Sequence, residues 1–396
     1  MSLSVRTPEY KIPEYSLTGD LLAYMNCGLQ YRYHNRGSLP PSLPVQLWFG
    51  EFVHGLMGES YLEWSEIDER QEFPWGWEEV IRPIELRISR RLKSQGLNPA
   101  PRVFCPYESD YDRSGLCLDP NHPHKLIASQ RADEAINTWG RYLFPLIDEP
   151  EVKLKGIRNM PSYIPDISRS NYYGITGIID VLSSVNIESA QTDNLILRYL
   201  DQNHVISDMI ESLEDTEYEI IIDYKGTRRP STDDPMWDAH NWQILTYAWL
   251  RRQQPNSRRI ISGIIFYLNE LAPSRTDLNR LRREIEDGIT DIIPEQEDLE
   301  ALFRWAGSGE PPEISRDLRT SRSIRVIPTD DASILNSLNR FDNVVNNIEN
   351  CVLEEMRGNG ILGSWNPVPR RRTCTACDFK TFCTNPAPRR YDVSIP

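Results

Sequence analysis

The chain has 396 residues, enough for two or three domains or for one core with large insertions. Hydrophobic residues make up 39% of the sequence, which excludes a largely disordered chain. The formal net charge is −14, so the protein as a whole does not attract nucleic acid, and any DNA contact must come from local basic patches or a bound cation. Only seven of the 44 basic residues are lysines, and the guanidinium groups that dominate suit bidentate phosphate contacts.

The cysteines and the absence of long apolar runs bear on the cellular compartment. No run approaches the roughly 18 apolar residues that cross a bilayer. Residues 1–22 mix charge, proline and short apolar pieces, unlike an export signal. Seven cysteines, three of them within ten residues near the C-terminus, fit a metal site in a reducing compartment better than a disulfide framework. We therefore expect a cytoplasmic protein.

Helices dominate the predicted elements of the first 146 residues. Apolar periodicity predicts helices over residues 16–33, 46–64 and 131–146. Residues 65–130 are rich in Trp, Pro and Arg, and we interpret them as an insertion with one amphipathic helix at residues 78–93.

Strands follow, with helices between them. Runs of β-branched and aromatic residues predict strands at 172–183, 218–224 and 260–268. Helical patterns occupy residues 195–213, within an acidic insertion at 188–217, and residues 236–253 and 332–356, whereas residues 273–328 give no clear assignment. The pattern predicts an α/β core with helical insertions. We expect five regions: N-terminal helices (1–64), an insertion (65–130), a core (131–270), a helical region (271–365) and a cysteine-rich segment (366–396).

The tripeptide Asp223-Tyr224-Lys225 ends one predicted strand. Residues two apart in a strand share a face, so the carboxylate and the amine point the same way. Asp180 lies late in another apolar strand, and pairing of the two strands would bring both carboxylates to one edge. Two carboxylates, a main-chain carbonyl and water suit Mg²⁺ or Mn²⁺. Lys225 would then act on a water or neutralise charge on a phosphate. For the tripeptide alone, a strand-end salt bridge is the simpler interpretation.

Three further polar residues lie on predicted helices. Gln243 and Tyr247 are four apart and share a helix face, which is also what an ordinary polar face with a half-buried tyrosine looks like. His54 lies on an otherwise apolar helix, where a histidine is more often a core residue than a ligand.

The C-terminal cysteines Cys374, Cys377 and Cys383 have the spacing C-x2-C-x5-C, which predicts a metal site. Such a site needs a fourth ligand, and Cys27 at the end of the first helix is the candidate. Zn²⁺ and a [4Fe–4S] cluster both accept four thiolates, and the spacing does not separate them. A weaker zinc candidate consists of Cys105, Cys117, His122 and His124.

In chain order, these motifs resemble the RecB-like branch of the PD-(D/E)XK nuclease superfamily. They are Cys27, Gly50-x3-His54, Asp180, Asp223-x-Lys225, Gln243-x3-Tyr247 and the cysteine triplet. The set is most similar to the iron–sulfur subgroup that includes the CRISPR-associated Cas4 exonucleases and the nuclease domain of AddB. The motifs span nearly the whole chain, with long insertions between them.

The resemblance implies a restriction-endonuclease-like core, a mixed β-sheet flanked by helices, with a metal-dependent DNA nuclease site. It implies that Mg²⁺ or Mn²⁺ is bound by His54, Asp180, Asp223 and the carbonyl of Tyr224. Lys225 would act on the attacking water, and Gln243 and Tyr247 would support the site or the DNA. It also implies a [4Fe–4S] cluster that joins the two ends of the chain through Cys27, Cys374, Cys377 and Cys383. Arg228 and Arg229 follow the lysine directly, and we expect them to contact DNA, a solvated surface being the equal alternative.

The resulting hypothesis is a Mg²⁺- or Mn²⁺-dependent deoxyribonuclease, an exonuclease on single strands or DNA ends, with no membrane partner. Repair or recombination, CRISPR adaptation and phage defence are the candidate processes, with a helicase, CRISPR or defence-system protein as partner. The alternative is a catalytically silent DNA-binding or assembly subunit that keeps the nuclease scaffold.

Overall fold

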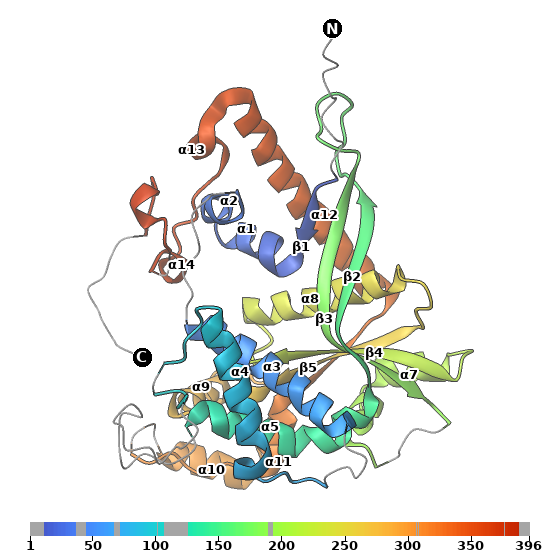
Figure 1. The fold of residues 1–396 in the computed structure, drawn as a ribbon, viewed down its shortest axis with the longest axis vertical. Helices are drawn as coiled ribbons and strands as arrows, with labels where there is room; N and C mark the ends of the chain where they lie inside the picture. The colour runs from blue at the N-terminus through green and yellow to red at the C-terminus, as the bar shows by residue number, and fades with distance from the viewer. Residues whose placement is uncertain are drawn as a thin grey trace.

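The computed structural model describes residues 12–36, 45–66, 72–100, 102–106, 126–188, 193–305, 307, 309–375 and 377–387. A six-stranded mixed sheet lies between two layers of helices (Figure 1). This confirms the predicted mixed α/β core flanked by helices. Within the described ranges, no helix has the length and apolarity that crossing a membrane requires.

The sheet has the strand order β1 (Glu14–Ser16), β3 (Tyr172–Asn186), β4 (Glu217–Lys225), β5 (Ile260–Tyr267) and β6 (Ile324–Pro328). The remaining strand, β2 (Ile147–Asn159), pairs with the other edge of β3 in a long antiparallel hairpin. β3 and β4 run antiparallel, β4 and β5 parallel, and β1 joins β3 in parallel. The three predicted strands are confirmed as β3, β4 and β5, whereas β1, β2 and β6 were not predicted.

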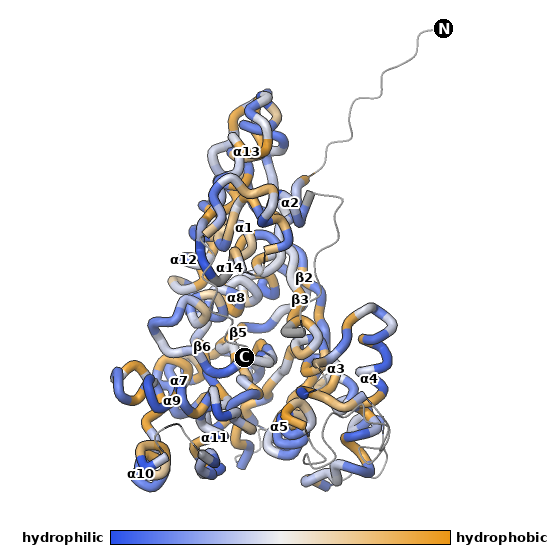
Figure 2. The backbone as a smooth tube through the Cα atoms, turned by 90° about the vertical axis from the view of Figure 1, so that its left-hand side faces the viewer, coloured by the Kyte–Doolittle hydropathy of each residue, from blue (hydrophilic) through white to orange (hydrophobic). Residues whose placement is uncertain are grey.

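Two groups of helices cover the two faces of the sheet. α3 (Val45–Glu66), α4 (Arg82–Ser94) and α5 (Ile127–Leu143) enclose one core with the sheet, and α8 (Pro235–Arg252) and α12 (Asp331–Glu354) enclose the other. The other helices are α1 (Ala23–Asn26), α2 (Gly28–Arg36), α6 (Leu195–Asp201), α7 (His204–Glu211), α9 (Arg275–Glu286), α10 (Gln296–Trp305), α11 (Arg316–Ser323), α13 (Gly360–Ser364) and α14 (Arg371–Thr375). Seen from the side, the molecule narrows toward the end that carries α13 (Figure 2).

Strand alternation divides the apolar residues of β4 between the two cores. Ile220 and Ile222 face α3 and α5, while Ile221 between them packs with α8 and α12. Every residue of β5 is buried, as expected of a strand with helices on both faces. β5 therefore has no polar face, which explains its apolar sequence, whereas β4 carries Glu219, Asp223 and Lys225 on its face toward α8.

The N-terminal helix is not continuous, contrary to the prediction over residues 16–33. A π-helical turn at Leu17–Leu22 leads into α1, and α2 begins only after Cys27, whose backbone is extended (φ −165°, ψ 110°). After this break the Leu29 N–H donates to the carbonyl of Asn366 at 3.3 Å. The break therefore attaches the N-terminal helices to the C-terminal segment, a contact between distant residues that local periodicity does not encode.

Candidate active site

The sheet divides where β3 and β4 separate. β3 pairs with β4 only from Val181 to Asn186, whereas β4 stays paired with β5 as far as Lys225. After Ile222, which pairs with Val181, the main chain of β4 has no main-chain partner in β3. The Asp180 carboxylate replaces that partner, because its Oδ2 accepts the Tyr224 N–H at 2.8 Å. The first predicted carboxylate therefore lies at the fork of the sheet.

Asp223 and Lys225 point from β4 toward α8, on one face as strand alternation requires. Asp223 is 2% exposed, and its Oδ2 lies 2.7 Å from Lys225 Nζ. Gln243 of α8 bridges the pair: its Nε2 donates to Asp223 Oδ1 at 3.1 Å, and its Oε1 accepts from Lys225 Nζ at 2.9 Å. Burial raises the pKa of the Asp223 carboxyl, and the Lys225 ammonium opposes this shift.

Tyr247 lies one turn after Gln243, and its hydroxyl accepts a hydrogen bond from Gln243 Nε2 at 3.0 Å. The ring fits against β3 because Gly177 has no side chain: a Cβ there would come within 2.6 Å of the ring. Burial raises the pKa of Tyr247 far above its usual range, so the phenol stays protonated. A neutral hydroxyl thus completes the polar row of Lys225, Gln243 and Tyr247.

His54 reaches the same edge from α3. Its Nδ1 lies 3.1 Å from Asp180 Oδ2, and its ring meets the Tyr224 ring edge to face. Burial opposes the charge on the imidazole, but the adjacent Asp180 carboxylate outweighs burial and raises the pKa of His54. The apolar helix therefore directs its histidine at a carboxylate and not into the core.

The donor set at this edge suits a hard divalent cation. Asp180 and Asp223 supply carboxylate oxygens, the ligands such a cation prefers, although Lys225 Nζ lies 2.7 Å from the Asp223 Oδ2 that would bind it. Yet in the described part of the chain no three His, Cys, Asp or Glu side chains gather closely enough to hold a metal ion. Instead, His54 Nδ1 lies 3.1 Å from one carboxylate and Lys225 Nζ 2.7 Å from the other.

Arg228 and Arg229, the expected DNA contacts, have partners within the protein. Arg229 is 4% exposed, and its guanidinium pairs with Asp291 and donates to the carbonyl of Ile324. Arg228 pairs with Glu284 and Asp234. These contacts hold the turn after β4 in place. A phosphate could reach Arg229 only if its buried ion pair with Asp291 broke. The sequence motif did not reveal this, because Asp291 and Glu284 lie in the segment that had no assignment.

Sequence reasoning missed His240, which lies one turn before Gln243 on α8. Its Nδ1 is 3.1 Å from the Tyr267 hydroxyl, and Tyr267 is the partner of Lys225 in the β4–β5 register. Burial, together with the nearby Lys225 and Arg325 cations, lowers the pKa of His240 to about 3. The imidazole is therefore neutral beside the lysine. The signal in the sequence was its spacing of three from Gln243, which places both on one helix face.

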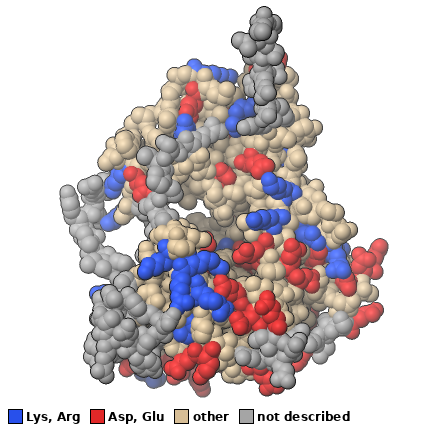
Figure 3. Space-filling view, viewed as in Figure 1, with Lys and Arg blue, Asp and Glu red and all other residues tan. Residues whose placement is uncertain are grey.

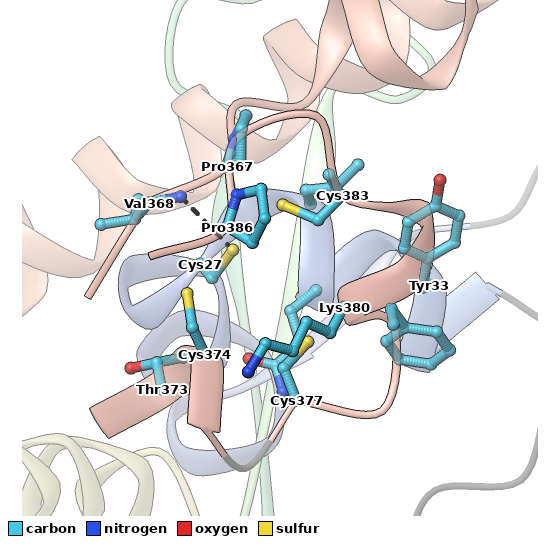
Figure 4. Close-up of a pocket in the computed structure, with 13 residues that line it drawn as sticks. Cys27, Tyr33, Pro367, Val368, Thr373, Cys374, Cys377, Lys380, Cys383 and Pro386 are labelled. Carbon is cyan, nitrogen blue, oxygen red and sulfur yellow. Dashed lines mark hydrogen bonds between the residues drawn. The ribbon is translucent and has the colours of Figure 1, made fainter. Parts of the chain in front are cut away.

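The four cysteines of the predicted cluster line one pocket, where Cys27 faces the C-terminal segment (Figure 4). The cavity between them measures about 20 Å³, room for one water or ion. Main-chain N–H groups of Val368 and Ala387 donate to the sulfurs of Cys27 and Cys374, both at 3.5 Å. No three of these cysteines, as described, lie close enough together to hold a metal ion, so the [4Fe–4S] cluster stays a prediction.

The weaker zinc candidate is largely outside the described residues, where Cys117, His122 and His124 lie. Cys105 is buried and disulfide-bonded, which removes its thiolate from that set.

Comparison with protein families adds an independent observation. The family model described as "PD-(D/E)XK nuclease superfamily" matches residues 204–384, a segment that begins after Asp180 and contains Asp223, Lys225 and the C-terminal cysteines. No curated protein matches the chain. Nucleases of this superfamily are typically hydrolytic and generally use Mg²⁺ or Mn²⁺. Residues 204–384 therefore form a PD-(D/E)XK nuclease superfamily domain.

Proposed function

We propose that this protein is a metal-dependent deoxyribonuclease that hydrolyses phosphodiester bonds, acting as an exonuclease on single strands or DNA ends. The observation that supports it best is the position of Asp180, Asp223 and Lys225 around the fork of the sheet: Gln243 bonds Asp223 and Lys225, and Asp180 bonds the main chain of Tyr224 between them. A strand-end salt bridge would need only Asp223 and Lys225. A second carboxylate and a glutamine that contacts both groups are the additional parts of a hydrolytic site.

Each residue has a role in the proposed site. Asp180, Asp223 and the Tyr224 carbonyl would hold Mg²⁺ or Mn²⁺, with His54 as a further ligand once it leaves Asp180. A bound divalent ion polarises the phosphodiester and makes water a better nucleophile at neutral pH. Lys225 orients the water or stabilises the charge on phosphate, and Gln243 fixes the position of its amine. Tyr247, protonated and bonded to Gln243, holds that amide in its orientation.

A cleavage assay tests this proposal directly. End-labelled single-stranded and duplex DNA are incubated with purified protein in Mg²⁺, Mn²⁺ or EDTA. We expect cleavage with either metal and none in EDTA, and we expect Asp180→Asn and Asp223→Asn to abolish it. Asp208→Asn, at an exposed aspartate of α7, makes the same chemical change elsewhere and should keep full activity. Full activity of both active-site variants would overturn the proposal.

The second candidate is a catalytically silent DNA-binding or assembly subunit. The observation in its favour is that Lys225 and His54 already lie beside the carboxylates and that the described residues hold no three-ligand group. DNA binding without cleavage in any divalent metal would establish it. For either candidate, we place the protein in DNA repair or recombination, CRISPR adaptation or phage defence, with a helicase, CRISPR or defence-system partner.

We also propose that Cys27, Cys374, Cys377 and Cys383 bind a [4Fe–4S] cluster, with Zn²⁺ as the alternative. Four thiols around one pocket and two N–H groups directed at sulfur support a thiolate-bound metal. Such thiols must stay reduced, as they are in a cytoplasm, whereas the disulfide-bonded Cys105 would favour an oxidising compartment. Metal analysis of anaerobically purified protein distinguishes iron with sulfide from zinc, and absence of both metals would reject the site.

A further inference from the structure

The outward face of the β2–β3 hairpin continues directly from the proposed active site. Asp180, Ile178 and Thr176 alternate along β3 and share this face. On β2, Lys153 lies opposite Ile178, and Lys155 lies opposite Thr176. A row of side chains therefore leads from the fork of the sheet along the hairpin.

This face is open, whereas the other face of the hairpin is closed. On the closed side, a Cβ at Gly156 would come within 2.6 Å of the Trp249 ring of α8, so the hairpin packs tightly on that helix. On the open side, the Lys155 side chain is 71% exposed and Ile178 is 49% exposed. Because the hairpin packs on α8 through its closed face, its open face has the same shape before any ligand binds.

A groove of about 470 Å³ lies on this part of the hairpin. It lies along β3 between the end of β1 and the fork, and its lining includes Tyr247 as well as both lysines. The hydroxyls of Ser16, Thr18 and Thr176 also line it. Lysines and hydroxyls are the side chains that contact phosphate oxygens in protein–DNA complexes.

The apolar side chains on the same face indicate which form of DNA fits. Ile178, Ile157 and Tyr172 are 49%, 62% and 41% exposed, and they share this face with the lysines. Bases stack on aromatic rings such as that of Tyr172 and can pack on exposed apolar side chains beside it, and a single strand presents its bases whereas a duplex hides them. At about 3.3 Å per residue, the eight steps from Tyr172 to Asp180 give a track of roughly 26 Å.

The basic patch over α4 that Figure 3 shows is a weaker candidate. Its arginines Arg87 and Arg91 pair with Glu59 and Glu63 of α3, so acidic side chains compete with any phosphate there. Among the described residues, no carboxylate lies within ion-pair distance of Lys153, and the pair of Lys155 with Glu14 is long (3.3 Å) and exposed, hence weak.

We infer that the outward face of the β2–β3 hairpin binds a single strand of DNA and leads it to the carboxylates at the fork. Lys153 and Lys155 contact phosphates, and Ile178 and Tyr172 pack against bases. The inference rests on the proposed nuclease function for the destination of the strand, but the binding itself needs no cleavage.

Binding can be measured separately from cleavage by using the Asp223→Asn protein in EDTA. The probe is a fluorescently labelled oligo-dT of about 12 nucleotides, a length within the usual range of single-strand site sizes, and its anisotropy reports binding. We expect Lys153→Ala and Lys155→Ala each to weaken binding about fivefold and to reduce the salt slope by about 0.7, the value for one phosphate contact. Glu14→Gln should tighten binding, because it frees Lys155. Lys93→Ala, at an exposed lysine of α4, is the matched control and should bind as the parent does.

Three results would overturn the inference: parental affinity in both hairpin variants, an equal loss in Lys93→Ala, or tighter binding of blunt duplex than of oligo-dT. Failure of the nuclease proposal looks different. Oligo-dT binding would then depend on the two lysines as expected, while the protein with Asp223 intact cleaves no DNA in Mg²⁺ or Mn²⁺.

Discussion

The Tyr224 N–H donates to the Asp180 carboxylate at 2.8 Å at the point where β3 and β4 separate. One side chain therefore has two tasks: it completes the hydrogen bonding of the sheet edge and supplies a carboxylate to the proposed metal site. The two tasks can be separated by substitution, because asparagine keeps an acceptor oxygen and alanine does not.

Asp180→Asn should keep the fold and lose cleavage. Asp180→Ala should lose cleavage too, and should also be destabilised by about 1–3 kcal/mol, because it leaves a buried N–H without its acceptor. Urea denaturation of the two variants and the parent measures the difference. Equal stability of the two variants would show that the hydrogen bond does not support the sheet edge.

Gln243→Leu should reduce cleavage about 10–100-fold by releasing Lys225 and Asp223 from their shared partner. Because Gln243 acts through Lys225, the pH–rate profile should move as well, which simple loss of packing would not cause. Gln253→Leu, at an exposed glutamine at the end of α8, is the control and should leave rate and profile unchanged. An unchanged profile in Gln243→Leu would remove the positioning role.

Cys377→Ser should lose the bound metal and, if the metal is a cluster, the brown colour. Iron, sulfide and zinc analysis measures the loss. Cys351→Ser provides the control, because Cys351 lies on α12 beside the Tyr24 hydroxyl and outside the pocket of four cysteines. Equal metal content in both variants would exclude Cys377 as a ligand.

Glu85→Gln should change how stability depends on pH. Glu85 is fully buried, and burial raises its pKa to about 7 against the lowering effect of Arg82, Ser129 and Trp77. The folded state therefore holds a proton that the unfolded state releases from pH 4.5 upward, so the stabilisation is complete below that pH and is lost as pH rises toward 7. The parent should lose stability relative to Glu85→Gln across this window. Chemical denaturation at pH 4.5, 6 and 7.5 measures the free energy of unfolding of each protein. Glu214→Gln, at an exposed glutamate, is the control, and its stability should depend on pH as that of the parent does.

Gly263→Ala should destabilise the protein by about 1–3 kcal/mol, as overpacking of a core does. A Cβ at this position of β5 would come within 2.0 Å of the Ile244 side chain of α8. Gly58→Ala is the contrasting case, because Gly58 lies inside α3 and a Cβ added there would meet no atom within 4 Å beyond the helix's own backbone. Alanine should therefore stabilise the helix by up to about 1 kcal/mol. Thermal unfolding of both variants checks the opposite signs.

Elements with a strong local signal could be predicted. β3, β4 and β5 follow the predicted strands within a few residues, and α3, α8 and α12 begin and end near the predicted bounds. In contrast, β2 alternates buried residues with Lys153 and Lys155, and its glutamates, lysines and a proline dilute the β-branched signal. β6 has only five residues and depends on its pairing with β5.

The sequence by itself determined the chemical types at the site and their order, because strand and helix periodicity fix which neighbours share a face: Asp223 with Lys225, and Gln243 with Tyr247. The tertiary structure alone decided that β3 leaves β4 at Asp180, that His54 turns toward that carboxylate, and that Asp291 and Glu284 occupy the arginines after β4. These contacts join residues many positions apart, and their free energy depends on strand pairing and on which charges are buried together, which no local pattern contains.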